Sequence, residues 1–261
     1  MAEERIRLMT RADDVGSFHS ANKAAFEAHT NGILKNASLM VVCPYIEEAA
    51  EMLIGKTELC YGLHLTMNAE WETLKWGPVL GADKAPSLVD SNGHFFATTQ
   101  EHHEHGAVFA EMLAECKAQL QRARDLGFEI SYMETHMGFG WLFEGEDDSQ
   151  RFGDELRKWA AEEGIIYDLP FLSRLPKLEN PTGDRIADLA ARYEQAQPGT
   201  YLVVGHTCFD DDEMRGHRLT GQEPLVEAKA RDEQRRIFTD KRILDVVARR
   251  NIEPIRYSEA G

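Results

Sequence analysis

The chain has 261 residues, a length that fits one or two ordinary domains or one large α/β barrel. Its 29 Lys and Arg residues stand against 45 Asp and Glu residues, which gives a formal net charge of −16. A surface this acidic repels phosphate backbones and anionic lipid headgroups, so we expect neither nucleic acid nor a membrane as a partner. Hydrophobic residues make up 43% of the chain, which excludes a compositionally disordered protein.

The sequence carries no signal for a membrane span or for secretion. No apolar run reaches the roughly 18 residues of a membrane helix, and the N-terminus lacks a basic segment followed by an apolar one. We therefore expect a cytoplasmic protein. The four cysteines lie too far apart to form a Cys-x-x-Cys pair, so we expect reduced and mostly buried thiols.

Short apolar runs alternate with amphipathic stretches in the first third of the chain, which is typical of strand-helix units around a parallel sheet. We expect strands at residues 6–10, 37–42 and 58–65, and helices at residues 20–31 and 45–53. The alternation then stops over residues 68–105, which are rich in Gly, Pro and Trp. This pattern predicts a long irregular insertion, a kind of loop that often serves function.

The same alternation returns in the rest of the chain. We expect helices at residues 107–126, from an acidic loop at 144–149 to about 163, at 186–197 and at 224–251, and strands at residues 129–136, 165–170, 200–206 and 254–257. No linker, low-complexity tract or internal repeat divides the chain. We therefore predict one domain over residues 1–261, folded as a single closed or nearly closed α/β barrel.

Polar side chains lie at or after the ends of four predicted strands. Asp13 and Asp14 follow the first strand, His64 lies in the third, and His136 and His206 end two later strands. Barrel enzymes build their active sites at the carboxyl ends of the strands, so we expect these five side chains to meet.

Two imidazoles and one carboxylate are a common ligand set for a divalent metal, with positions left for water and substrate. We expect Asp14, His64 and His136 to bind one such ion. Asp13 would then accept a proton from activated water, and His206 would act as general acid because an ordinary imidazole titrates close to neutral pH. The pattern predicts a metal-assisted hydrolase.

Several motifs also resemble, in the same order, those of the YdjC/ChbG-like carbohydrate (chitooligosaccharide) deacetylase family. Residues 10–16 read T-R-A-D-D-V-G, where the family has N-A-D-D-F-G, and residues 62–66 read its G-L-H-L-T motif. Further matches are A-S-L-M at residues 37–40, E-T-H at 134–136 and G-H at 205–206. The resemblance covers essentially the whole chain.

This resemblance implies a distorted (β/α) TIM-like barrel related to polysaccharide deacetylases. It also implies a divalent ion, zinc or magnesium, on the residues that match Asp14, His64 and His136. By the same transfer, Asp13 is the catalytic base and His206 the acid in the removal of an N-acetyl group from a small amino-sugar saccharide. A homodimer is the commonest assembly for such a protein and stays open here.

The chain departs from the family pattern at three places, one of which is Asp168, where the family tends to carry an arginine on a strand. Residues 137–141 read M-G-F-G-W where the family has further histidines, and T-C-F follows His206 where the family has P-G. Two other functions therefore stay open: a saccharide-binding or regulatory barrel without catalysis, and a metal-dependent sugar isomerase or aldolase. Fold alone does not choose between these chemistries.

Three further features have both a functional and a structural interpretation. Four aromatic side chains could stack on a sugar or simply pack against the barrel: Trp71, Trp76, Phe139 and Trp141. The run Q-E-H-H-E-H at residues 100–105 looks like a metal site but is more typical of a solvated segment. Cys208 lies near His206, although no third group is evident to orient a thiol nucleophile.

Overall fold

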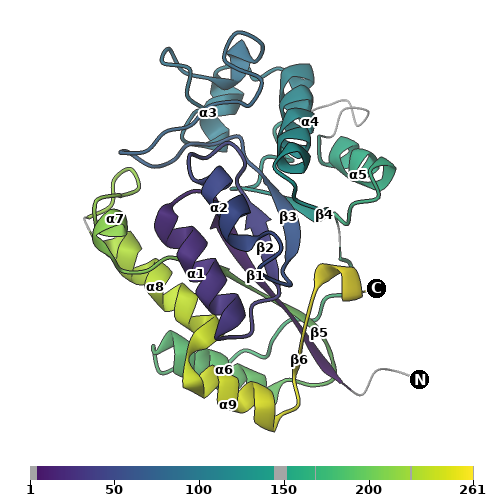
Figure 1. Cartoon of the computed structure of the whole chain (residues 1–261), viewed down its shortest axis with the longest axis vertical. Coiled ribbons are helices and arrows are strands. Elements are labelled where there is room, and N and C mark those ends of the chain that lie inside the picture. The colour runs from purple at the N-terminus through teal and green to yellow at the C-terminus, as the bar shows by residue number, and fades with distance from the viewer. Residues whose placement is uncertain (1–4, 144–151, 168, 224, 261) are drawn as a thin grey trace.

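The computed structural model describes residues 5–143, 152–167, 169–223 and 225–260 of the chain (Figure 1). Its described strands form a six-stranded sheet in the order β4-β3-β2-β1-β5, and β6 pairs with β1. All of these neighbours are parallel. The strands are β1 (Ile6–Val15), β2 (Asn36–Leu39), β3 (Cys60–Leu65), β4 (Ile130–Thr135), β5 (Gly199–His206) and β6 (Glu253–Ile255). A parallel-sheet α/β fold is thus confirmed.

Helices connect the strands and cover the sheet from outside, as Figure 1 shows for the adjacent α1 and α8. The longer ones are α1 (His19–Thr30), α2 (Ile46–Leu53), α4 (Phe109–Asp125), α5 (Phe152–Glu162), α6 (Arg185–Gln195), α8 (Val226–Thr239) and α9 (Lys241–Arg249). Helix α1 packs on β1, α4 on β3 and α8 on β5. Residues of β1 are buried along nearly its whole length, as expected for a parallel strand covered on both faces. None of the described helices has both the length and the apolar character needed to cross a bilayer.

The inner side of the sheet depends on a glycine in β3. A Cβ atom at Gly62 would lie 2.1 Å from the ring of Tyr132 in β4, so any larger residue would displace this ring. Tyr132 stacks on Tyr257 with 3.8 Å between the ring centroids, and its hydroxyl lies 3.0 Å from the Ser38 hydroxyl. Tyr257 belongs to the short helix η3 (Tyr257–Glu259), so this packing places η3 against Tyr132 of β4.

The closed barrel that the sequence predicts is not shown. Among the described residues, strand pairing runs from β4 to β5 without joining these two strands. Ile166 makes an isolated parallel bridge to Tyr132, and Ser173 makes one to Tyr201 of β5. The predicted strand at 165–170 is therefore reduced to the bridge at Ile166, and Asp168 lies outside the described residues. Pro170 explains part of this difference, because it has no N–H to donate to a neighbouring strand.

The long helix predicted at 224–251 is wrong in one respect, because two helices occupy this range. Asp240 has an extended backbone, with φ −64° and ψ 135°, between α8 and α9. Its side chain accepts a hydrogen bond from the amide of Arg242 and so caps α9. Aspartate is a favoured N-cap residue, and here it outweighs the helical periodicity on either side.

The insertion at 68–105 is largely irregular, as predicted, but it contains η1 (Pro86–Leu88) and α3 (Thr99–Glu104). Its histidine run is not simply solvated, because His102 is fully buried and its Nε2 contacts the carbonyl of Met67. Helix α4 also contacts the insertion. Its buried Glu115 accepts hydrogen bonds from the amides of Val79 and Leu80 at 2.9 and 3.0 Å. The acidic loop predicted at 144–149 lies outside the described residues.

Candidate metal centre and catalytic residues

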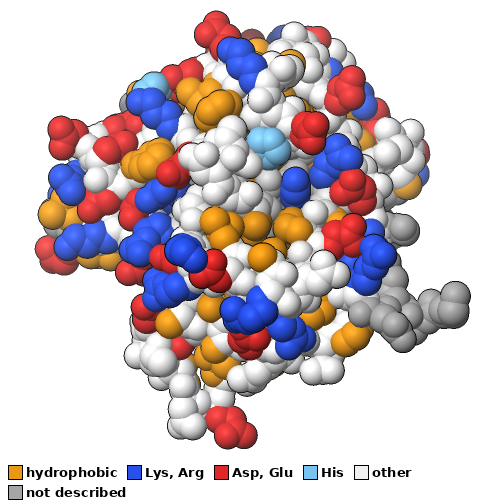
Figure 2. All heavy atoms as spheres, turned by 60° about the horizontal axis from the view of Figure 1, so that its bottom comes forward, with side chains coloured by type: hydrophobic (Ala, Val, Ile, Leu, Met, Phe, Trp, Pro, Cys, Tyr) orange, Lys and Arg blue, Asp and Glu red, His pale blue; other side chains and the backbone are white. Residues whose placement is uncertain are grey.

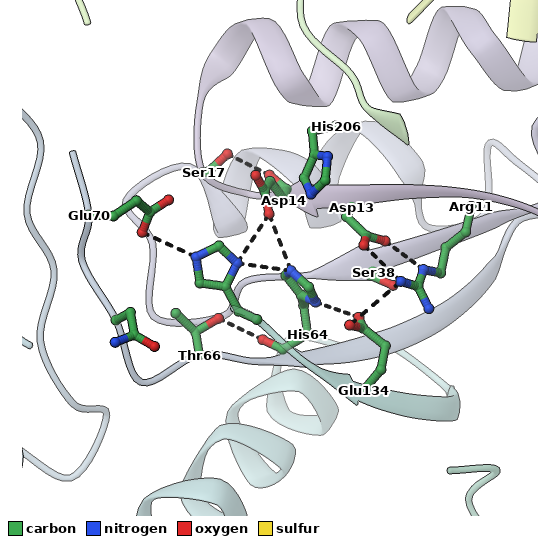
Figure 3. A network of polar contacts seen from close by, with 12 residues as sticks. Arg11, Asp13, Asp14, Ser17, Ser38, His64, Thr66, Glu70, Glu134 and His206 are labelled. Atoms are coloured by element: carbon green, nitrogen blue, oxygen red, sulfur yellow. Dashed lines mark hydrogen bonds and ion pairs between the residues drawn. The ribbon is translucent and has the colours of Figure 1, made fainter. Parts of the chain in front are cut away.

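The predicted site residues lie together at the carboxyl ends of four strands (Figure 3). Asp13 and Asp14 are near the end of β1, His64 is in β3, His136 directly follows β4, and His206 ends β5. The parallel register pairs Asp13 with His206 across β1 and β5. The sheet therefore brings together side chains that lie almost 200 positions apart in the chain.

Asp14 has an unusual backbone for a strand residue, with φ of 62°. Successive strand residues normally point to opposite faces, so this left-handed conformation allows Asp13 and Asp14 to face the same region. The turn that follows supports it, because the Ser17 amide donates to the Asp14 carbonyl at 3.1 Å. The next bend uses Gly16 at φ 97°, whose amide donates to buried Asn22 at 2.8 Å. Backbone strain of this kind persists only where the surrounding structure holds it in place.

Three potential ligand atoms converge on one point. Oδ1 of Asp14 lies 3.2 Å from Nε2 of His64 and 3.5 Å from Nδ1 of His136. The two imidazole nitrogens lie 3.1 Å apart. All three side chains are buried, and Oδ1 of Asp14 has no hydrogen bond of good geometry from any described residue.

The far nitrogen of each imidazole faces a carboxylate. Nδ1 of His64 contacts Glu134, and Nε2 of His136 lies 3.1 Å from Oε2 of Glu70. Because a carboxylate accepts hydrogen bonds, these nitrogens carry the ring protons, and the lone pairs of the other two point at each other and at Asp14. Three lone pairs in one place repel unless a cation or a proton lies between them. The residues present therefore fit a divalent ion.

The second oxygen of Asp14 is already bound. Nη1 of Arg231 donates to Oδ2 at 2.7 Å, and the guanidinium lies 4.9 Å from the ring centre of Trp71. Burial by itself would raise the pKa of the Asp14 carboxyl, but Arg231 and the two neighbouring histidines hold this pKa well below its usual range. The carboxylate is thus ionised at neutral pH.

The carboxylates also shift the two histidines. Burial by itself would lower the pKa of His64, but Glu134 and Asp14 hold it well above its usual range. Burial opposes the shift of His136 too, yet Glu70 and Asp14 raise the pKa of this imidazole to about 9. A metal ion must therefore displace protons to bind here at neutral pH.

Asp13 forms a bidentate ion pair with Arg11, with Nε to Oδ1 at 2.6 Å and Nη2 to Oδ2 at 2.8 Å. Arg11 also donates to the Tyr257 hydroxyl at 2.9 Å and lies 3.7 Å from Oε2 of Glu134. Asp13, His64 and Glu134 form a second close group of potential ligands, but the guanidinium already places a positive charge beside its two carboxylates. The ion pair fixes the orientation of Asp13.

His206 is oriented by a glutamine of α8. Oε1 of Gln234 lies 3.0 Å from Nδ1 of His206 and also accepts the His206 amide at 2.9 Å. An amide oxygen only accepts, so Nδ1 carries a proton and Nε2 is left for other chemistry. Figure 3 shows the ring beside Asp14 and Asp13.

Four residues of the site were given no role by the sequence: Arg11, Glu70, Glu134 and Arg231. Two of them carried a detectable signal, because Arg11 and Glu134 each stand two positions before a predicted site residue in a strand and so share its face. Glu70 and Arg231 come from the insertion and from α8, segments that are distant in sequence from the residues that they contact.

The aromatic residues and the cysteine that the sequence also offered as candidates differ in how exposed they are. Trp71, Trp76 and Phe139 are buried and pack in the core, whereas Trp141 is 41% exposed. Cys208 is fully buried, and burial raises the pKa of its thiol to about 12. The thiol is therefore neutral at physiological pH, which argues against a nucleophilic role.

The chain is similar to known proteins along most of its length. The family model described as YdjC-like protein matches residues 7–145. A carbohydrate deacetylase from Thermoanaerobacter pseudethanolicus is 26% identical over 96% of this chain and 98% of its own. A carbohydrate deacetylase from Vibrio cholerae is 24% identical over 97% of this chain and 96% of its own.

A solved structure has the same fold. It comes from Enterococcus faecalis and is described as a candidate cellobiose-phosphate cleavage protein. It matches this chain with a TM-score of 0.72 and 19% identity, covering 97% of this chain and 98% of its own. The family model covers more than half of the chain and includes Asp13, Asp14, His64 and His136, and the chain belongs to the YdjC-like protein family.

Proposed function

We propose that this protein is a metal-dependent hydrolase that removes an N-acetyl group from a small amino-sugar saccharide. The observation that carries this proposal is the convergence of Asp14, His64 and His136. A carboxylate contacts the ring nitrogen of each imidazole that points away from Asp14 and so orients the ring. A divalent ion held there would polarise the acetyl carbonyl as a Lewis acid and make a water molecule more acidic. Two imidazoles favour zinc over magnesium in this ligand set. The relatives named as carbohydrate deacetylases are similar over nearly their whole length, which supports the substrate class.

Asp13 is the catalytic base in this proposal. Its carboxylate lies next to the cluster, and the bidentate pair with Arg11 fixes both oxygens without placing a proton on either. It can therefore accept a proton from the water that attacks the acetyl carbon. Arg11 is a positioning residue, and it is itself held by the hydroxyl of Tyr257.

His206 is the general acid. Gln234 accepts the proton on Nδ1, so Nε2 is the nitrogen that can donate to the departing sugar nitrogen. The products of the reaction are acetate and an amino sugar. Asp13 and His206 lie on adjacent strands in register, so one residue can accept a proton while the other donates one to the same substrate.

Trp141 is the candidate for a contact with the sugar ring. Together with Thr135, which precedes His136, it lines a pocket of about 270 Å3. Its partly exposed ring offers an apolar face of the kind that stacks on sugars.

The test is acetate release from a panel of N-acetylated mono- and disaccharides. Chelated protein would be supplied in turn with zinc, magnesium, manganese and cobalt. Metal-dependent release of acetate from at least one sugar is the expected result. Absence of acetate from protein that binds one ion per chain would contradict the proposal. Sugar binding without turnover would then indicate a regulatory barrel, and an isomerised or cleaved sugar would indicate an isomerase or aldolase.

A further inference from the structure

A second cavity lies along the outer edge of β5, away from the metal cluster. Its volume is about 730 Å3, within the range of small-molecule sites. The walls are β5, the chain at residues 172–177, the first turns of α6 and one residue of α8. None of the five predicted site residues lines it.

The edge of β5 is open where it borders this cavity. Ser173 donates to the carbonyl of Thr200 on this side, and the amide of His206 donates to Gln234 further along. Backbone groups alternate between the two edges of a strand. Val204 lies four positions from Thr200 and two from His206, so its amide and carbonyl point to the same side as theirs. No described residue hydrogen-bonds to them there. The cavity therefore offers a backbone donor and acceptor to a ligand.

Apolar side chains from three elements line the cavity. Leu175 comes from the connecting chain, Leu189 from α6, Leu202 from β5 and Ile237 from α8. The wall formed by the connecting chain is held in place by Arg192 of α6, which donates to the carbonyls at positions 175 and 176. Leu175, Leu189 and Ile237 are themselves buried, so the apolar surface that a ligand can cover comes from the partly exposed lining residues Leu172, Leu202 and Val204.

The charges around the cavity are opposite in sign to those of the chain as a whole. Its lining contains four basic residues and one acidic residue, in a protein of net charge −16. Arg174, Lys177 and Arg185 are exposed, and none of them pairs with an acid among the described residues. The one acid, Asp188, is already bound by the amides of Thr182 and Gly183. Figure 2, which turns the α6 and α9 end of the molecule forward, shows hydrophobic side chains on this face among both basic and acidic side chains.

We propose that this cavity binds an amphipathic organic anion, that is, a carboxylate, sulfonate or phosphate monoester with an apolar body. The apolar part would cover the partly exposed leucine and valine side chains, and the anionic group would lie among Arg174, Lys177 and Arg185. Charge complementarity favours an anion over a neutral sugar, because three exposed cations that pair with no acid of the described chain line this cavity. This site is independent of the proposed deacetylation.

The test uses 8-anilinonaphthalene-1-sulfonate, an apolar anion whose fluorescence rises when it leaves water. Folded wild-type protein should bind it saturably at one molecule per chain, with or without zinc. The double variant Lys177→Ala/Arg185→Ala should bind it at least about tenfold more weakly, because two cationic partners are lost. Lys117→Ala, which removes an exposed lysine of α4, is the matched control and should bind like wild type.

Two further measurements complete the test. The neutral analogue N-phenyl-1-naphthylamine should bind more weakly than the sulfonate, and zinc affinity should be the same in all variants. The proposal is overturned if wild-type protein shows no saturable binding of the sulfonate, or if the double variant binds it as tightly as wild type. Equal binding of the neutral analogue would also overturn it. Each of these results is independent of acetate release.

Discussion

Two neighbouring aspartates have different partners in this site, and this difference can be tested. Asp14 points into the ligand cluster, whereas Asp13 is paired with Arg11 beside it. Asp13→Asn should therefore keep metal and lose turnover, by about 10²- to 10⁴-fold for the loss of a general base. His64→Ala should lose both metal and turnover. Metal content per chain and kcat on the same preparations distinguish the two effects. Equal metal loss in both variants would contradict the division of roles.

Glu70 is predicted to act through His136. It lies in the insertion and accepts from Nε2, so it sets which nitrogen of the imidazole is free to bind metal. Glu70→Gln keeps the shape but removes the charge, and we expect metal affinity to fall about 10- to 100-fold with the fold intact. Competition against a chelator of known affinity measures this.

The same segment supplies the control for Glu70. Glu72 is two positions further on and pairs with Arg218 at the surface, away from the cluster. Glu72→Gln should leave metal affinity unchanged. Loss of affinity in both variants would mean that charge or folding of the insertion, rather than the contact with His136, determines the effect.

At the scale of single elements, the break between α8 and α9 depends on the Asp240 cap. Asp240→Ala should lower the free energy of unfolding by about 1 kcal/mol, the usual contribution of such a cap, measured by urea denaturation. Asp240→Asn should retain most of this stability, because asparagine also caps. Asp240 pairs with Arg236 and Arg242 as well, so a loss as large in the asparagine variant would mean that charge, not capping, matters here.

The elements also show which strands and helices hydrophobic periodicity predicts correctly. Six of the seven predicted strands recur with shifted ends, because apolar runs between turns are strong signals. The predicted strand at 165–170 is reduced to a parallel bridge at Ile166 among the described residues. The single helix at 224–251 is wrong, because the Asp240 side chain caps a backbone amide. The cap is an effect of a single residue, which a pattern averaged over many residues does not contain.

At the scale of the whole molecule, a metal ion bound as proposed would join side chains of β1 and β3 to His136, which follows β4, and should stabilise the fold. Without metal, His136 has a pKa of about 9, raised above its unfolded value, so its protonated form contributes stability at low pH. This contribution is complete below the unfolded pKa of about 6.5 and is lost as pH rises towards 9. The same protons compete with metal.

The thermal shift caused by metal should therefore grow as pH rises from about 6.5 to 9. The zinc concentration is kept fixed across the pH series, and at the pH where it equals 100 times Kd, zinc should add about 2.7 kcal/mol. Differential scanning calorimetry with and without zinc measures this, with His64→Ala as the control that shows no shift. A shift that is the same at every pH would mean that zinc does not displace these protons.

The sequence by itself determined the family, the parallel α/β fold and the five polar residues that end the strands. Family membership is confirmed, and the five residues do lie together, while their roles remain proposals. These inferences were possible because strand periodicity and short motifs are local properties of a chain. Only the tertiary structure decided the rest: that no named strand among the described residues joins β4 to β5, and that Glu70 and Arg231 reach His136 and Asp14. Such contacts join segments 66 and 217 positions apart, and no local pattern encodes a meeting that depends on how the whole chain packs.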